Sequence, residues 1–115
     1  MKILIAGSMS VTDFDLSPYI LPETELIISG GAKGIDTLAE IYADIHGISK
    51  LVIRPRYNLY GKAAPLKRNE VMVDMADRVV VIWDGVSKGS LYTAKYAENK
   101  NKDVVLVNLK EEKHL

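Results

Sequence analysis

The chain contains no cysteine, and its fifteen basic residues are balanced by fifteen acidic ones. The lack of thiols excludes disulfides, a thiol nucleophile and a zinc ribbon. The lack of net charge argues against a protein that coats DNA or RNA, because such proteins usually have a basic excess. No apolar run approaches membrane-spanning length, and the apolar N-terminal segment is too short for a signal peptide. We therefore expect a cytoplasmic protein of bacterial type with no membrane partner.

The chain has 115 residues, of which 48% are hydrophobic and 26% are charged. These values are ordinary for a globular protein that is long enough to bury a core. We expect a single domain over residues 1–109, followed by a charged tail over residues 110–115. His46 ends a helical pattern with no second histidine or carboxylate at metal-binding spacing, so we expect no metal site. We also expect no cofactor.

Residues 2–6 and 78–83 are apolar throughout rather than alternately, which is typical of parallel strands covered on both faces. In all, five strands are expected, at residues 2–6, 25–29, 49–54, 78–83 and 103–108. Helical patterns separate them, over residues 34–46, 65–76 and 91–101, the last capped by Ser90, and a shorter one runs from Thr12 or Asp13 to Tyr19. This alternation predicts an α/β, Rossmann-like three-layer fold with a five-stranded parallel sheet of order 3-2-1-4-5 and helices on both faces.

The chain is organised around residues 29–36, Ser-Gly-Gly-Ala-Lys-Gly-Ile-Asp, which lie between an expected strand and an expected helix. Glycines there let the backbone bend so that peptide N–H groups point into one concavity. The following helix adds free N–H groups and the positive end of its dipole. Such a turn is suited to phosphate, although the same sequence also suits a tight turn that binds nothing.

In an open parallel sheet, a ligand binds beyond the carboxyl ends of the strands, where the strand order reverses. Three loops meet there in the expected order, at residues 7–10, 30–34 and 84–90, and they are the loops richest in glycine and serine. Cations also lie at three helix starts, where they are mildly unfavourable. These cations are Lys33, then Lys62 with Lys67 and Arg68, and Lys88. A bound anion would remove that conflict, so the sequence predicts an anion site.

Four motifs in this order resemble the SLOG superfamily, and the resemblance covers nearly the whole chain. They are Ser29-Gly30-Gly31-Ala32-Lys33-Gly34-Ile35-Asp36, Tyr60-Gly61-Lys62-Ala63-Ala64, Arg68-Asn69, and Trp83-Asp84-Gly85 with Ser87-Lys88-Gly89-Ser90. The chain most resembles the small single-domain branch related to YspA and YpsA. The superfamily is similar to the Smf/DprA DNA-processing proteins, some of which bind single strands, and to the LOG phosphoribohydrolases. The resemblance implies a Rossmann-like fold that binds nucleotides or nucleotide-derived ligands.

The resemblance also implies roles for single residues. Gly30, Gly31 and Gly34 would hold a phosphate. Gly89 and Ser90 match the Gly-Thr of a second family motif and would hold the same or a neighbouring phosphate. Together, the loops and the resemblance give these candidate ligand-binding residues: Gly7, Ser8, Gly30, Gly31, Lys33, Gly34, Asp36, Arg68, Asn69, Asp84, Gly85, Ser87, Lys88, Gly89 and Ser90.

Whether the protein is an enzyme stays open at this point. The LOG enzymes carry a Pro-Gly-Gly-x-Gly-Thr-x-x-Glu motif whose glutamate acts in glycosidic cleavage. Here Asp84 and Gly85 stand in the Pro-Gly-Gly region, and Thr93 falls at the glutamate position, where a threonine cannot serve as the acid or base. For a nucleoside-monophosphate phosphoribohydrolase or another N-glycosidic hydrolase, the candidate catalytic residues are Arg68, which matches the family's basic position, and Asp84 or Asp36.

We therefore predict a protein that binds a small nucleotide-derived ligand, as a sensor of that ligand. The main alternative is the N-glycosidic hydrolase. A further alternative is binding of single-stranded nucleic acid, with Tyr57, Tyr60 or Tyr92 as stacking platforms. We favour packing of these tyrosines against loops, and we do not expect nucleic acid as a partner. Dimers are common in the superfamily, so the resemblance also implies a homodimer.

Overall fold

Five parallel strands form the sheet of this protein, whose computed structural model describes the backbone of residues 1–112 and the side chains of residues 1–110. The strand order β3-β2-β1-β4-β5 is the one predicted from the sequence. The strands are β1 (Lys2–Gly7), β2 (Leu26–Ser29), β3 (Ser49–Val52), β4 (Arg78–Trp83) and β5 (Asp103–Asn108). They lie where the apolar segments predicted them.

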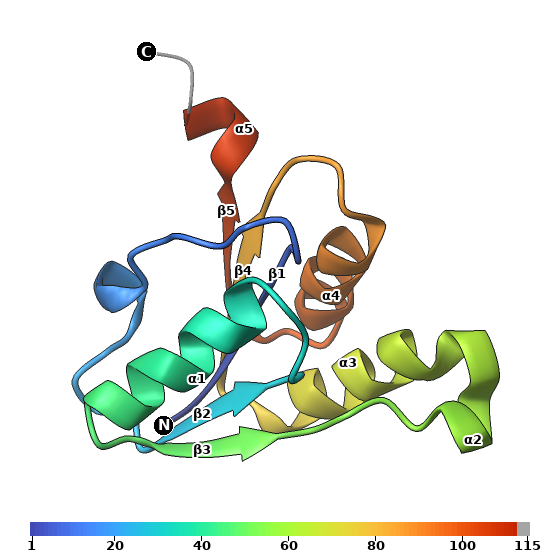
Figure 1. Ribbon diagram of the computed structural model, residues 1–115, viewed down its shortest axis with the longest axis horizontal. Helices are drawn as coiled ribbons and strands as arrows, with labels where there is room; N and C mark the ends of the chain where they lie inside the picture. The colour runs from blue at the N-terminus through green and yellow to red at the C-terminus, as the bar shows by residue number, and fades with distance from the viewer. Residues whose placement is uncertain (113–115) are drawn as a thin grey trace.

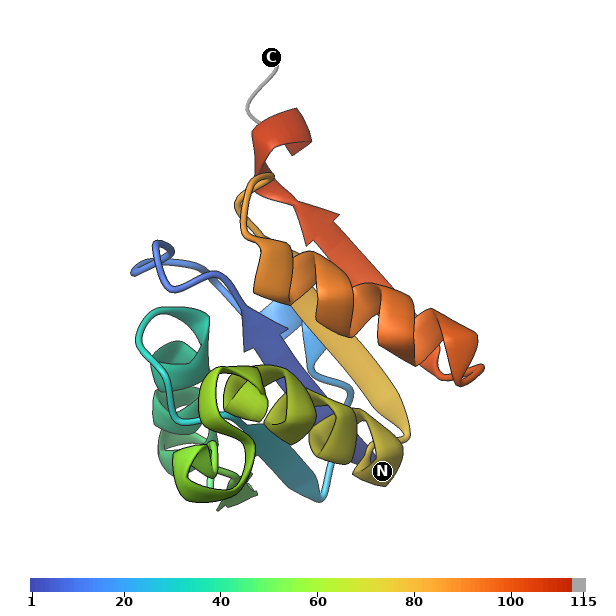
Figure 2. The ribbon, with the colours of Figure 1, turned by 90° about the vertical axis from the view of Figure 1, so that its right-hand side faces the viewer.

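Helices cover both faces of the sheet, as predicted. The helices and helical turns are η1 (Ser17–Tyr19), α1 (Ile35–Ile45), α2 (Tyr57–Tyr60), η2 (Gly61–Ala63), α3 (Ala64–Met75), α4 (Lys88–Asn99) and α5 (Leu109–Glu112). α1 packs on one face, whereas α3 and α4 pack side by side on the other (Figures 1 and 2). Of the helices within residues 1–112, none has the length and apolar character needed to cross a membrane.

Two apolar layers explain why the central strands β1, β2 and β4 are almost entirely apolar. Along β1, Ile3 and Ile5 belong to the core on the α1 side, whereas Leu4 and Ala6 belong to the core under α3 and α4. All four side chains are buried. The same alternation continues in β2 and β4, so the central strands need an apolar residue at almost every position.

The register of the strands decides which loops meet. Gly7, at the end of β1, pairs with Ile82 of β4, and Leu4 of β1 pairs with Ile28 of β2. The strand order reverses between β1 and β4, so the carboxyl ends of β1, β2 and β4 lie together at the switch point. Figure 2 shows the end of β1 emerging between α1 and α4.

The helix predicted at residues 12–19 is wrong. Only η1 is helical in that segment, and the rest is irregular. Leu16 is buried there, and the ring of Phe14 stacks on that of Tyr19 with centroids 5.9 Å apart. Pro18 keeps the helical turn short. These apolar side chains cover the α1 side of the sheet from an irregular backbone, so the segment packs without forming a longer helix.

The predicted start of the last long helix is also wrong. α4 begins at Lys88 rather than at residue 91, and Ser90 lies inside its first turn instead of capping it. The Asp84 carboxylate accepts hydrogen bonds from the N–H groups of Val86 (2.9 Å) and Ser87 (2.8 Å). These bonds close a turn directly before the helix and thereby start it early, with Ser87 in the N-cap position.

Other predicted boundaries lie within two residues of the observed ones. Gly34 is the N-cap of α1, and Gly47 follows that helix with φ +65°, as expected of the residue after a helix end. β3 ends at Val52 instead of residue 54, and α4 ends at Asn99 instead of residue 101. In the predicted tail, residues 110–112 belong to α5, whereas residues 113–115 lie outside the described residues.

Candidate functional site

The three loops that were expected to meet at the switch point lie against one another. A Cβ atom on Gly34 would lie 2.5 Å from the carbonyl oxygen of Ser8 and 2.7 Å from that of Met9, so the glycine turn touches the loop after β1. The loop after β4 is tied to the same segment. The N–H of Asp84 donates to Ser8 Oγ (3.0 Å), and Ser10 Oγ donates to Asp84 Oδ2 (2.8 Å).

Serine hydroxyls fix the start of α4 beside the end of β1. Ser8 and Ser90 are 1% and 6% exposed, and their hydroxyl oxygens lie 3.3 Å apart. Ser90 Oγ also donates to Ser87 Oγ (3.2 Å), and the indole N–H of Trp83 donates to the Ser87 carbonyl oxygen (2.9 Å). The first turn of α4 is therefore held in one place relative to the sheet.

A hollow of about 210 Å³ lies between α1, α3 and α4, and we call it the glycine-loop hollow. Its lining residues are Ala6, Gly7, Met9, Ala32, Asp36, Pro65, Leu66, Arg68, Asn69, Met72, Ser87, Gly89, Ser90 and Thr93. The predicted residues among them are Gly7, Asp36, Arg68, Asn69, Ser87, Gly89 and Ser90. The predicted residues that do not line it are Ser8, Gly30, Gly31, Lys33, Gly34, Asp84, Gly85 and Lys88.

A chain of hydrogen bonds joins the glycine turn to α4 through α3. Arg68 donates through Nη1 to the carbonyl oxygen of Gly30 and through Nε to Asn69 Oδ1 (2.7 Å). Asn69 Nδ2 donates to Thr93 Oγ1 (2.8 Å), and that hydroxyl donates to the carbonyl oxygen of Gly89 (3.0 Å). Residues from three separate stretches of sequence are thus oriented as one unit.

Asp36 and Arg68 place opposite charges in the wall of the hollow. Burial raises the pKa of Asp36, and a hydrogen bond from the N–H of Ala32 (3.1 Å to Oδ2) and the charge of Arg68 oppose that rise. Burial lowers the pKa of Arg68, and the charge of Asp36 opposes that fall. Each charge therefore reduces the cost of burying the other.

The start of α4 presents free donors to the hollow. Within the described part of the chain, the N–H groups of Lys88, Gly89 and Ser90 have no acceptor. The first N–H groups of a helix lack partners within the helix, and the helix dipole adds positive potential there. A Cβ atom on Gly89 would have no atom within 4 Å, so the space beside these donors is open.

The glycines of the turn after β2 have no such open space. A Cβ atom on Gly30 would lie 2.7 Å from Arg68 Nη1 and 2.8 Å from Asp36 Oδ2. On Gly31, where φ is +73°, it would lie 2.8 Å from Arg54 Nη1, which donates to the Gly31 carbonyl oxygen (3.2 Å). These two glycines therefore let arginine side chains reach the carbonyl groups of the turn.

Asp84 serves the structure of its own loop. Hydrogen bonds from the N–H groups of Val86 and Ser87, with a smaller contribution from the hydroxyl of Ser10, lower the pKa of Asp84 to about 2 from its ordinary 3.8. The carboxylate is therefore ionised at neutral pH. It also lies outside the lining of the hollow, so it is poorly placed as a general acid.

Sequence reasoning placed Thr93 at the glutamate position of the LOG motif but did not count it among the site residues, and it missed Met9, Leu66 and Met72 as apolar residues of the site. Thr93 follows Gly89 by four residues on a helix, so the two share one face, and that spacing could have identified it. Met9 and Leu66 are exposed beside the hollow, and nothing in a single sequence separates them from other surface residues.

A larger hollow of about 420 Å³ lies against another face of α3 and shares Arg68 with the first. We assign the candidate site to the smaller hollow, because the free N–H groups of α4 and the hydrogen-bonded chain from Arg68 to Gly89 converge there. Among the residues whose side chains are described, no group of three or more histidines and carboxylates could hold a metal ion.

No protein-family model and no curated protein matches the chain. Among solved structures, the chain is similar to the X-ray structure of DNA processing protein A (DprA) from Streptococcus pneumoniae, with a TM-score of 0.70 and 22% sequence identity. The match covers 91% of this chain and 49% of the DprA chain, so this chain spans about half the length of DprA. The likeness shows that the two share a Rossmann-like fold.

Proposed function

We propose that the glycine-loop hollow binds the phosphate of a nucleotide or nucleotide-derived ligand. The observation that carries this proposal is the start of α4, where Gly89 leaves open space beside N–H groups that have no acceptor among the described residues. Arg68 lines the same hollow and adds a positive charge. Free N–H groups, a helix dipole and a guanidinium group around one concavity favour an anion.

The size of the hollow favours a ligand that is only partly enclosed. Its volume of about 210 Å³ is below the roughly 300–1,000 Å³ of sites that enclose a whole small molecule. It suits a phosphate and the adjoining sugar, with the rest of the ligand lying over the exposed side chains of Met9 and Leu66. Asp36, in the wall of the hollow, would accept a hydrogen bond from a ribose hydroxyl.

The sequence motifs support the same class of ligand. A Rossmann-like fold shared with DprA is compatible with the SLOG superfamily, and we place the chain in its branch related to YspA and YpsA as part of this proposal. A role as a cytoplasmic sensor, acting as a homodimer, belongs to the same proposal. The balanced charge of the chain gives no support to nucleic acid as the ligand.

The substitution Gly89→Asp tests the proposed phosphate site. The new side chain enters open space and places a carboxylate where the phosphate would lie, so binding should be lost. An acidic residue in the first turn of a helix adds about 0.3–1 kcal/mol of stability, so the fold should not suffer. Gly89→Ala is the matched control, because it adds a Cβ atom without a charge.

The measurement is a thermal-shift panel of nucleotides, nucleotide sugars, dinucleotides and second messengers. A ligand at about 100 times its Kd adds about 2.7 kcal/mol to stability. Each kcal/mol moves the unfolding midpoint of a small domain by roughly 4–8 °C. We expect a shift for the unmodified protein and for Gly89→Ala, and a clearly smaller shift for Gly89→Asp. Equal shifts in all three proteins, or no shift with any ligand, would refute the phosphate site.

Hydrolysis of an N-glycosidic bond is a second candidate function, and Asp36 favours it. This carboxyl group lines the hollow beside Arg68, and burial raises its pKa. Such a group can deliver a proton to a departing base. The test is release of free base from the nucleotide panel. Release should be abolished by Asp36→Asn and unaffected by Asp84→Asn, and a panel that yields no free base would contradict this function.

A further inference from the structure

The larger hollow lies between α2, α3 and the segment that follows β3, and we call it the α2–α3 hollow. Its volume of about 420 Å³ is within the roughly 300–1,000 Å³ that is usual for small-molecule sites. Lys67, Val71 and Asp74 line it from one face of α3, whereas Asn69 and Met72 line the glycine-loop hollow from another face. The two hollows therefore lie on different faces of α3, and Arg68 lines both.

One wall of the α2–α3 hollow is apolar and unusually exposed. Leu59 and Tyr60 of α2 are 60% and 49% exposed, and Val71 of α3 is 49% exposed. Ile53 completes this wall. Exposed apolar side chains that gather in a concavity mark a binding surface more often than scattered ones do. A flat apolar group fits this wall.

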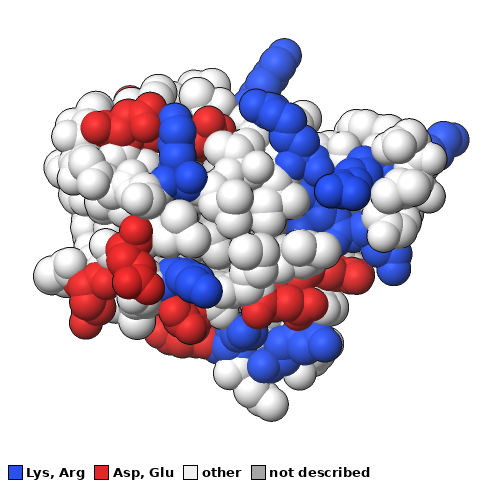
Figure 3. All heavy atoms as spheres, turned by 90° about the horizontal axis from the view of Figure 1, so that it is seen from below, with Lys and Arg blue, Asp and Glu red and all other residues white. Residues whose placement is uncertain are grey.

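The lining of the α2–α3 hollow also includes arginine side chains. Arg54 and Arg56 line the hollow on either side of Pro55. Arg54 donates a hydrogen bond to the carbonyl oxygen of Gly31, and the guanidinium of Arg56 has no partner within the described part of the chain. Figure 3 shows lysine and arginine side chains gathered at the end of the molecule where α2 and the start of α3 lie.

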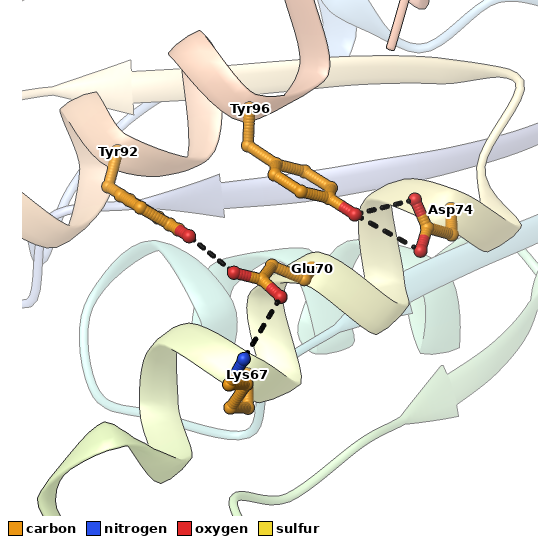
Figure 4. Close-up of polar contacts among 5 residues, drawn as sticks. All are labelled: Lys67, Glu70, Asp74, Tyr92 and Tyr96. Carbon is orange, nitrogen blue, oxygen red and sulfur yellow. Dashed lines mark hydrogen bonds and ion pairs between the residues drawn. The ribbon is translucent and has the colours of Figure 1, made fainter. Parts of the chain in front are cut away.

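Two carboxylates, those of Glu70 and Asp74, also line the hollow, and both are engaged by neighbouring side chains. Glu70 accepts a hydrogen bond from the hydroxyl of Tyr92 and forms an ion pair with Lys67 (3.8 Å). Asp74 accepts a hydrogen bond from the hydroxyl of Tyr96 (3.0 Å). Figure 4 shows these contacts drawing both carboxylates toward α4. Among the residues whose side chains are described, neither Arg54 nor Arg56 forms an ion pair with a carboxylate. The lining holds four cationic side chains (Arg54, Arg56, Lys67 and Arg68) and two carboxylates, so positive charge is in excess.

We propose that the α2–α3 hollow is a second ligand site, which takes an aromatic anion. The flat ring would lie against Leu59, Tyr60 and Val71, and the phosphate or carboxylate of the ligand would bind Arg54 and Arg56. A nucleotide belongs to this class, and so does an aromatic carboxylic acid. The site is independent of the phosphate site at the start of α4, and it stands if that site fails.

The experiment uses the full chain with Gly89→Asp, so that the start of α4 is blocked. Amide signals are followed by NMR while adenosine monophosphate, adenosine, inorganic phosphate or indole-3-acetate is added. We expect one of the two aromatic anions to shift the signals of Arg56, Tyr60 and Val71. Adenosine has the ring without the anion, and phosphate has the anion without the ring, so both should bind at least about tenfold more weakly.

Two substitutions locate the binding site. Arg56→Glu reverses an exposed charge, and Val71→Asp removes part of the apolar wall, so each should weaken binding by about tenfold or more. Lys62→Glu is the matched control for Arg56→Glu. It reverses an exposed cation that lies outside the lining, so it should leave the affinity within about twofold.

The outcomes distinguish the possible ligands. Binding of adenosine monophosphate but not indole-3-acetate would show that the site takes a phosphate. Binding of indole-3-acetate but not adenosine monophosphate would show that it takes a carboxylate. The absence of binding by both, equal affinity in Arg56→Glu, or shifts confined to other surfaces would overturn the second site. So would a dimer in analytical ultracentrifugation that Val71→Asp dissociates, because a second copy would then cover the hollow. Failure of the phosphate site would appear separately, in the unmodified protein, where the Trp83 indole signal at the start of α4 would not respond to any of the ligands.

Discussion

Gly34 and Gly89 both lie at helix starts, yet their surroundings differ. Gly34 has φ +77°, and a Cβ atom there would meet the backbone carbonyl groups of Ser8 and Met9. Gly89 lies in the first turn of α4 and faces open space. The absence of a side chain is thus required by the backbone at Gly34, whereas at Gly89 it only leaves room for a ligand.

We predict opposite effects of alanine at these two positions. Gly34→Ala should lower the free energy of unfolding by more than about 2 kcal/mol, because both the positive φ and the backbone contacts oppose a Cβ atom. Gly89→Ala should raise it by about 0.5–1 kcal/mol, since alanine is the better helix former. Urea unfolding at constant m-value measures both. Equal stability of the two variants would contradict this account.

Asp84 and Asp36 make opposite contributions to stability as the pH changes. Hydrogen bonds from backbone N–H groups hold the pKa of Asp84 at about 2 in the folded state, below the ordinary 3.8. Its ionised form therefore stabilises the fold above about pH 4, and this stabilisation is lost as the pH falls toward 2. Burial raises the pKa of Asp36, so protonation of Asp36 at low pH favours the folded state.

We predict that Asp84→Asn flattens the acid limb of the stability profile. The unmodified protein should be more stable than Asp84→Asn above about pH 4, and the difference should shrink as the pH approaches 2. Asp36→Asn should show the reverse trend, because it removes a group whose protonation favours folding. Unfolding in urea at a series of pH values measures both differences. Parallel profiles for the two variants would refute the assigned pKa directions.

Single residues of the site differ in how far the sequence could predict them. The glycine-rich loops and Arg68 were found from the sequence, because glycine and charge are strong local signals. The contacts of Arg54 and Arg68 with the carbonyl groups of the turn could not be found, since they join residues more than twenty positions apart. Those contacts, and not the glycines alone, shape the turn.

At the scale of helices and strands, the candidate site depends on how α3 and α4 are joined. Asn69 of α3 donates to the hydroxyl of Thr93 on α4, and that hydroxyl donates to the carbonyl oxygen of Gly89. Thr93 is 1% exposed, so water cannot readily replace either bond. The outer rims of the two helices are joined by Tyr92 with Glu70, whose contact faces solvent (Figure 4). The buried link is therefore the stronger determinant of the hollow.

We predict energetic coupling between Asn69 and Thr93. In a double-mutant cycle of Asn69→Ala and Thr93→Val, the double variant should lose about 1 kcal/mol less unfolding free energy than the sum of the two single losses. The reason is that either change alone already breaks the shared hydrogen bond. The control cycle pairs Asn69→Ala with Lys95→Ala, an exposed position on α4. That cycle should be additive within about 0.3–0.5 kcal/mol. Additivity in both cycles, measured by urea unfolding, would remove the proposed link between the helices.

Predictions of secondary structure succeeded where a whole element is buried, and failed where only a few side chains of a segment are buried. The central strands β1, β2 and β4 are buried on both faces, so their apolar runs are evident in the sequence. Residues 12–19 cover the sheet with a few side chains on irregular backbone, and no periodic pattern reports that arrangement. The early start of α4 depends on bonds from Val86 and Ser87 to Asp84, which outweighed the capping preference of Ser90.

At the scale of the whole molecule, the strand order decides where the chemistry lies. The alternation of strands and helices suggested the order β3-β2-β1-β4-β5, and that order alone brings the three serine- and glycine-rich loops together. The overall charge of the chain does not help to locate the site, because the numbers of acidic and basic residues are equal. The cations are nevertheless unevenly spread and gather near α2 and the start of α3 (Figure 3). Any attraction for anions is therefore local.

This charge distribution predicts a weak dependence of ligand binding on salt. A small ligand held at one or two phosphates has no condensed counterions to release, so its slope of log K against log[salt] should be shallower than the roughly −0.7 per phosphate contact of a single strand. A single-stranded oligonucleotide of fifteen bases should bind no more tightly than the best mononucleotide, because a neutral molecule has no continuous basic track for further phosphates. Fluorescence titrations between 50 and 200 mM salt, about the range over which phosphate contacts are screened, measure both quantities. A steep slope together with tighter binding of the oligonucleotide would show that the cations near α2 act as a nucleic-acid surface, and single-strand binding would then replace the small-ligand function.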